Sequence, residues 1–188
     1  DTRVTGAASL SESGMSTNSF NYTLPTLVDG VAVTASYSPN KGQDESDTAY
    51  AIVYTGVEGL TLSYGAGSSD GDAAGSGGTA ANADTVSMKA SYAIGSFTLA
   101  YSDHDHDSNT DTSDQTATSW KVSYTVSDAV SLTYGTESID SKATADTSDA
   151  EYTKITASHT SGGMTVSANY QEATEMSYTT AANEDEEY

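Results

Sequence analysis

Three lysines recur at nearly constant spacing along the chain. They are Lys89, Lys121 and Lys154, which are 32 and 33 residues apart. Each stands among Ser, Thr and Gly positions that alternate with apolar ones. Because successive side chains of a strand point to opposite faces, all three lysines are expected on one polar face. A row of ammonium groups on such a face would attract anions.

A second candidate site is a run of acids with the spacing of a calcium-binding loop. Positions 1, 3, 5, 7, 9 and 12 of that pattern fall on Asp103, Asp105, Asp107, Asn109, Asp111 and Asp114. The Gly usual at position 6 is replaced by Ser108, and position 12 lacks its usual Glu. The pattern therefore allows a calcium ion as a cofactor but favours a solvated acidic loop, and no other cofactor is expected.

The same run brings together residue types that act as general acids and bases. These are Asp103, His104, Asp105 and His106. Contiguous residues of one loop rarely converge on a point, and His159 is expected near the opposite rim. We therefore expect no enzyme.

The composition excludes other classes of protein. Among 188 residues, 6 are Lys or Arg and 27 are Asp or Glu, which gives a net charge of −21. Nucleic-acid binding through a basic surface is excluded, and the absence of cysteine excludes disulfides and thiolate sites. No apolar run is long enough for a spanning helix. A membrane barrel is still allowed, because its lipid face uses only alternate residues.

Alternation of apolar and polar residues runs through the whole chain. The clearest example extends from Trp120 to Tyr134, with a short turn at Ser127–Ala129. Five such hairpins predict ten antiparallel strands over residues 15–172, followed by an acidic tail at 173–188. Short turns alternate with long acidic loops, at roughly 38–47, 67–84, 103–116 and 137–149. The pattern predicts an all-β, up-and-down antiparallel sheet with two unlike rims.

A tyrosine is expected at the end of each second strand. The five are Tyr37, Tyr64, Tyr101, Tyr134 and Tyr170. An amphipathic ring at that place suits an aromatic girdle at a membrane interface. The alternative is ordinary cross-strand packing.

The residues resemble the general-diffusion porins of the Gram-negative outer membrane, in particular alphaproteobacterial ones. The resemblance rests on the hairpin Ala117–Tyr134 and on Asn18–Pro25, which is similar to a porin strand that follows the constriction loop. It implies a transmembrane β-barrel in the outer membrane that passes small hydrophilic solutes passively. It also implies a homotrimer in contact with lipid and lipopolysaccharide, and assigns the three lysines to the basic wall of the pore.

The resemblance further implies a barrel of about sixteen strands, of which residues 1–188 would form the C-terminal two-thirds of a single domain. A complete ten-stranded barrel is the structural alternative. The functional alternative is a secreted or surface-layer structural protein built of β-repeats rich in Ser and Thr. Selectivity would depend on the lysines that face the lumen and on the acidic extracellular loops.

Overall fold

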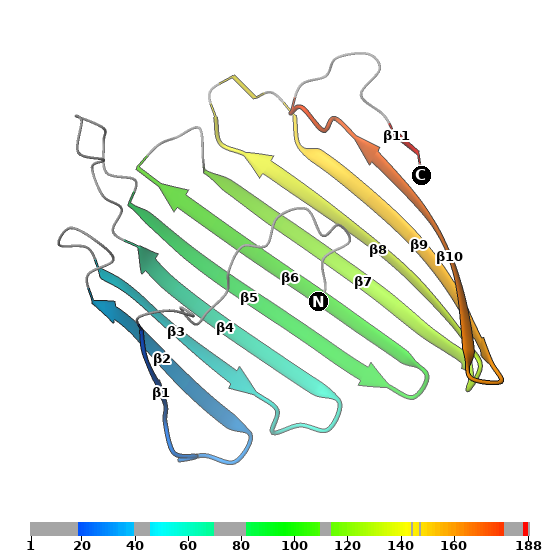
Figure 1. Cartoon of the computed structure of the whole chain (residues 1–188), viewed down its shortest axis with the longest axis horizontal. Helices are drawn as coiled ribbons and strands as arrows, with labels where there is room; N and C mark the ends of the chain where they lie inside the picture. Colours follow the sequence, from blue (N-terminus) through cyan, green and yellow to red (C-terminus); the bar gives the residue numbers. More distant parts are fainter. Residues whose placement is uncertain are drawn as a thin grey trace.

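The computed structural model describes residues 19–39, 46–69, 82–109, 114–143, 145–146, 148–178 and 186–187. Within these ranges the chain forms a single antiparallel sheet in which each strand pairs with the next in sequence (Figure 1). The strands are β1 (Phe20–Thr23), β2 (Val31–Pro39), β3 (Ser46–Tyr54), β4 (Leu60–Ser69), β5 (Ala83–Ile94), β6 (Phe97–Ser108), β7 (Gln115–Ser127), β8 (Val130–Ser141), β9 (Ala150–Ser161), β10 (Met164–Thr174) and β11 (Glu186–Glu187). The described ranges contain no helix long and apolar enough to cross a membrane.

The five predicted hairpins are confirmed as β1–β2, β3–β4, β5–β6, β7–β8 and β9–β10. Their turns define one rim of the sheet, which we call the short-turn rim, and the connections between successive hairpins define the long-loop rim. Two of the tight turns use a left-handed backbone: Gly95, between β5 and β6, has a φ of 57°, and Gly162, between β9 and β10, has a φ of 58°. Glycine adopts this conformation without steric cost, so its position in the sequence favours a turn here.

The strands are longer than the alternation of apolar residues predicted. β6 runs to Ser108 and β8 to Ser141, so both continue seven residues beyond the tyrosines that were expected to end them. The predicted loops 103–116 and 137–149 are therefore wrong at their start. Beyond the tyrosines, the residues on the face that carries the apolar side chains become polar. The alternation of apolar and polar residues therefore stops, although the backbone pairing of the strands continues.

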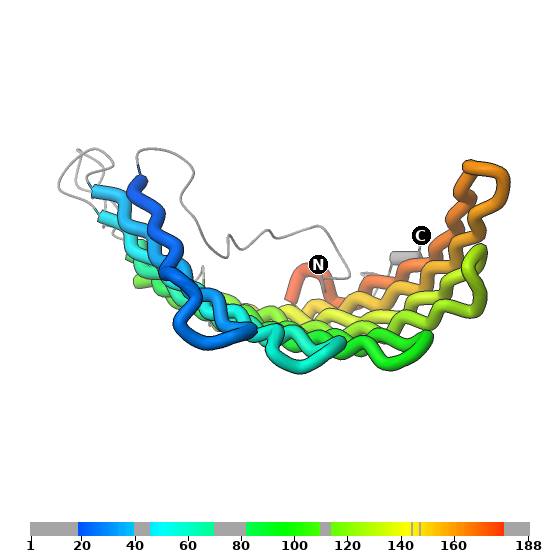
Figure 2. The backbone as a smooth tube through the Cα atoms, turned by 90° about the horizontal axis from the view of Figure 1, so that it is seen from below, coloured from blue at the N-terminus to red at the C-terminus, as the bar shows by residue number. Residues whose placement is uncertain are grey.

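The sheet is a strongly curved wall with a concave and a convex face (Figure 2). Side chains crowd together on the concave face, where Ser102 is fully buried and Ala117 is 3 % exposed. They spread apart on the convex face, where Leu99 is 49 % and Trp120 42 % exposed. The large apolar side chains therefore cover the convex face, and small or polar ones line the concave face.

The strand order runs linearly from β1 to β11, so the described strands do not close into a barrel by themselves. The two-residue strand β11 pairs with Glu172 and Ala173 near the end of β10. It was not predicted, because residues 173–188 were expected to be an acidic tail. Closure, the total number of strands and the domain limits stay predictions.

Candidate functional site

The three lysines all lie on the concave face, on β5, β7 and β9. Lys121 and Lys154 share one row of the sheet, on either side of Gly135, which has no side chain. Lys89 lies in the neighbouring row, where it pairs with Ser102. The prediction that the three lysines share one face is therefore confirmed. The prediction of a single row is wrong for Lys89 and holds for Lys121 and Lys154.

An acidic residue that the sequence analysis placed in a loop lies among these lysines. Glu137, on β8, is 2 % exposed and pairs in register with Ser119 and Tyr152. It is thus diagonal to Lys121 and to Lys154, at the about 7–8 Å spacing that long side chains can bridge. The signal for Glu137 was the continued alternation after Tyr134, which puts residues 131, 133, 135 and 137 on one face.

The burial of this carboxylate makes the nearby lysines favourable. A buried charge is costly unless opposite charges and hydrogen bonds compensate it. Lys121 and Lys154 lie on the two strands that flank Glu137, and Lys89 shares its row through Ser102 and Ser119. Among the described residues, this part of the concave wall thus carries three lysines with one acid, Glu137, among them, while a second buried acid, Asp47 on β3, lies on the same face away from them.

Hydroxyl groups cover much of the remaining concave wall. Pairs of oxygens on neighbouring strands lie within hydrogen-bonding distance: Ser102 and Ser119 Oγ at 2.7 Å, Ser131 and Ser158 Oγ at 2.7 Å, and Ser123 Oγ and Thr133 Oγ1 at 3.1 Å. Such groups can both donate to and accept from water and polar solutes. The concave wall is therefore suited to contact with water.

The candidate acid–base residues are separated by the alternation of β6. His104 and His106 point to the concave face, where their Nδ1 atoms lie 2.6 Å from Ser87 Oγ and 3.2 Å from Thr85 Oγ1. Asp103 and Asp105 point to the convex face. Neither acid can therefore orient an imidazole, as a catalytic dyad requires. His159, on β9, lies near the short-turn rim as expected.

The acids of the calcium pattern do not surround a common point in the described residues. Asp103 and Asp105 accept hydrogen bonds from Thr118 Oγ1 at 3.1 Å and Thr116 Oγ1 at 2.7 Å, while Asp114 Oδ1 accepts the backbone N–H of Ser108 at 2.6 Å. Within the described ranges no group of three or more His, Asp or Glu side chains could hold a metal ion. Asp111 lies outside those ranges, so the complete calcium set stays a prediction.

Asp105 links the long-loop end of β6 to the β8–β9 connection. Its carboxylate lies 3.0 Å from Lys142 Nζ, and both side chains are about two-fifths exposed. Asp105 is four residues beyond Tyr101, on the polar part of the convex face. The hydrogen bond from Thr116, followed by the contact with Lys142, lowers the pKa of Asp105.

This arrangement predicts how the Asp105 pKa responds to substitution. Because the folded-state pKa is lowered, the contacts add stability above the ordinary Asp range and lose it as the pH falls through the lowered value. We expect both Thr116→Val and Lys142→Gln to raise the Asp105 pKa, since each removes a contact that lowers it. An NMR titration of the carboxyl group in micelles measures both shifts. An Asp105 pKa that stays unchanged in either variant would contradict the assignment.

The five predicted tyrosines all lie on the convex face, among the apolar side chains. Their exposed fractions fall between 36 % and 46 %, and Tyr134 packs against Trp120 with ring centroids 5.3 Å apart. On β6 the convex face is apolar up to Tyr101 and acidic beyond it. Tyr101 thus marks the border between an apolar band and a polar band, as a girdle residue would. The girdle role of the five stays a prediction.

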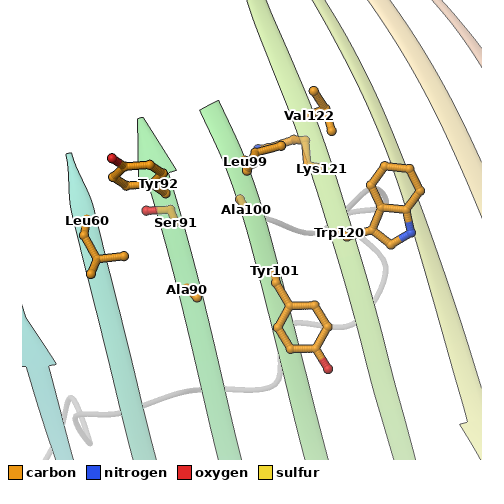
Figure 3. Close-up of a pocket in the computed structure, with 10 residues that line it drawn as sticks. All are labelled: Leu60, Ala90, Ser91, Tyr92, Leu99, Ala100, Tyr101, Trp120, Lys121 and Val122. Carbon is orange, nitrogen blue, oxygen red and sulfur yellow. The ribbon is translucent and has the colours of Figure 1, made fainter. Parts of the chain in front are cut away.

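A second set of aromatic residues lies towards the short-turn rim, which the sequence analysis did not single out. Phe97 and Tyr124 stack there with centroids 4.5 Å apart. Between the two aromatic levels, the convex face of β4–β7 holds a shallow cavity of about 280 Å³ (Figure 3). Figure 3 labels the side chains around it, which include Leu60, Tyr92, Leu99, Tyr101, Trp120 and Val122. This surface is suited to hydrocarbon rather than to water.

Comparison with known proteins gives a family match over nearly the whole chain. The family model described as Gram-negative porin matches residues 2–188. A search of curated proteins finds no match.

Solved structures of similar fold are outer-membrane proteins. An anion-selective porin from Comamonas acidovorans has 18 % identity and a TM-score of 0.69, over 82 % of this chain and 48 % of that one. OmpT (in-vitro folded), an outer membrane protein of Vibrio cholerae, has 17 % identity and a TM-score of 0.63, over 82 % and 53 %. A loop L8 deletion mutant of that OmpT gives 17 % and 0.61, over 83 % and 57 %. The chain thus spans about half the length of these structures.

Proposed function

Because the chain belongs to the Gram-negative porin family, whose members are β-barrels of the outer membrane, we propose that it forms the wall of a passive diffusion channel for small hydrophilic solutes and ions. The observation that carries the proposal is the division of every long strand between two faces. The convex face carries exposed apolar and aromatic side chains, whereas the concave face carries Ser, Thr, Lys and Glu. A barrel in lipid with a water-filled lumen requires this division.

The lysines of the concave wall support a selectivity that favours anions in the lumen. Lys89, Lys121 and Lys154 place three positive charges where a solute would pass, and Glu137 offsets part of them. The Comamonas neighbour is described as anion-selective, which fits this direction. Acidic loops at the long-loop rim would act further out, by collecting cations at the entrance.

Membership of the porin family also bears on the remaining alternatives. It favours a channel over an enzyme, in agreement with the separation of the acids and imidazoles on β6. The family match also explains the Ser- and Thr-rich hairpins as strands of a porin, and so favours a porin over a secreted or surface-layer structural protein. Assembly as a homotrimer and contact with lipopolysaccharide are proposed from family resemblance.

Liposome swelling tests the proposed function. The purified protein is reconstituted into liposomes, which are diluted into isotonic solutions of neutral sugars. We expect rapid swelling with monosaccharides and slower swelling with trisaccharides, in proportion to the amount of protein. Swelling no faster than in protein-free liposomes, for every sugar, would refute the diffusion channel.

The embedded acid gives a prediction of its own. Glu137→Gln removes a negative charge beside Lys121 and Lys154 while keeping the shape of the side chain. We expect the selectivity to move towards anions by about sevenfold, because a unit charge about 7 Å away changes the energies of a passing anion and a passing cation by about 0.6 kcal/mol each in water, with opposite signs. Reversal potentials in a salt gradient measure the change.

The matched control is Glu151→Gln, which removes the same charge from the convex side of β9. It should leave the reversal potential as in the unmodified protein. Equal shifts in the two variants would show that the concave position of Glu137 does not matter.

A further inference from the structure

Residues 175–178, which follow β10, lie over the concave face of the sheet. Figure 2 shows the orange-red segment that follows β10 rising on the concave side of the wall. Tyr178, in this segment, packs against a buried apolar cluster formed by Ala117, Ile139 and Ala150, together with Tyr152. These residues belong to β7, β8 and β9, so the tyrosine packs against strands other than β10, which precedes it in the chain.

Backbone contacts hold the segment in this position. The backbone N–H of Tyr178 donates to the carbonyl of Glu175 at 2.8 Å, and its carbonyl accepts the N–H of Ser148 at 3.2 Å. Glu175 and Tyr178 have φ angles of 54° and 59°, in the left-handed region that residues other than glycine rarely adopt. Such a conformation persists only where surrounding contacts enforce it.

The environment of the Tyr178 ring is partly dry. Burial, followed by the nearby Tyr152 and Asp146, raises the pKa of the Tyr178 phenol. A tyrosine ring without contacts to the concave face would be surrounded by water. The burial of the Tyr178 ring therefore agrees with its apolar contacts, and the side chain serves as an anchor of the segment.

The anchor lies directly beside the charged part of the concave wall. Tyr152 is two residues from Lys154, and Ala117 is four residues from Lys121 along β7. At about 3.3 Å per residue these separations are roughly 7 and 13 Å. In both strands the apolar cluster lies on the long-loop side of the lysine. A solute entering from that rim would pass the segment before it reached the lysines.

We propose that residues 175–178 form a constriction that Tyr178 anchors to the concave wall, and that this constriction limits the size of the solutes that reach the lysines. The inference rests on the proposed channel function. Residues Ala117 and Ala150 form the seat of the ring, since their small side chains leave space for it beside Ile139. Residues 175–178 themselves narrow the passage, because they occupy volume on the concave side.

Single-channel recordings and liposome swelling with Tyr178→Ala test the proposal. We expect a conductance about 1.5-fold higher, because an unanchored segment leaves a wider cross-section. Disaccharide entry should increase more than monosaccharide entry. Tyr178→Phe, which keeps the ring, should behave as the unmodified protein, and so should Tyr22→Ala on the convex face of β1. Unchanged conductance and an unchanged disaccharide-to-monosaccharide ratio in Tyr178→Ala would overturn the constriction.

A labelling experiment gives an independent readout. Because the chain has no cysteine, Tyr178→Cys introduces a single thiol for a bulky water-soluble reagent. We expect modification to lower the conductance, whereas modification of Tyr22→Cys should not. No effect of modification at position 178 would place the segment outside the conduction path. If the unmodified protein does not conduct, the channel proposal itself fails; if it conducts and both tests are negative, only the constriction fails.

Discussion

Replacement of Lys89, Lys121 and Lys154 together by Gln is expected to move the ion selectivity towards cations by at least several fold. Each ammonium group stabilises an anion passing about 7 Å away by about 0.6 kcal/mol in water, and destabilises a cation equally. The substitutions also leave Glu137 as the remaining charge of this part of the wall, so its effect adds to the change. The reversal potential in a potassium chloride gradient gives the permeability ratio directly.

The matched control for this variant is Lys142→Gln. Lys142 lies on the exposed connection between β8 and β9, where it contacts Asp105 rather than the concave wall. Its removal should change the permeability ratio little, and less at high salt, where exposed charges are screened. An unchanged permeability ratio in the triple variant would show that the three lysines do not set the selectivity of the channel.

Leu99→Arg is expected to destabilise the protein in a membrane by about 2–4 kcal/mol, the cost of an arginine near the middle of the lipid face of a barrel. Leu99 is 49 % exposed on the convex face and pairs with Val122, midway between the two aromatic levels. Reversible unfolding by urea or guanidinium in lipid vesicles measures the free energy of unfolding.

Thr98→Arg is the control for Leu99→Arg, because it introduces the same side chain one residue away. Thr98 points to the concave face, where an arginine can be hydrated. We expect its free energy of unfolding to lie much closer to that of the unmodified protein. Equal destabilisation by the two arginines would mean that the two faces do not meet different solvents.

Local patterns were sufficient to predict the hairpins. The alternation through Trp120–Tyr134 and the glycine turn at Gly95 each act over a few residues, and the up-and-down order follows because short turns join neighbouring strands. The face of each lysine followed from the same alternation. The resemblance to porins, which rested on two short stretches, is confirmed by the family match over residues 2–188.

Features that depend on distant parts of the chain were not predicted. The strand ends were misplaced because hydrogen-bond pairing continues where the apolar pattern stops. As a result, Glu137 was assigned to a loop and not to the concave face of β8. Equal spacing of the lysines did not give equal rows, because turn geometry and connection lengths set the register of each strand. The position of Tyr178 depends on contacts with β7–β9, which no local pattern encodes.

Planar-bilayer recording of the unmodified protein tests whether the concave wall borders a water-filled passage through the outer membrane. We expect protein purified in detergent to insert in discrete conductance steps, with a reversal potential shifted by fixed charge in a salt gradient. Absence of steps from a protein that stays folded and dispersed without detergent would contradict such a passage.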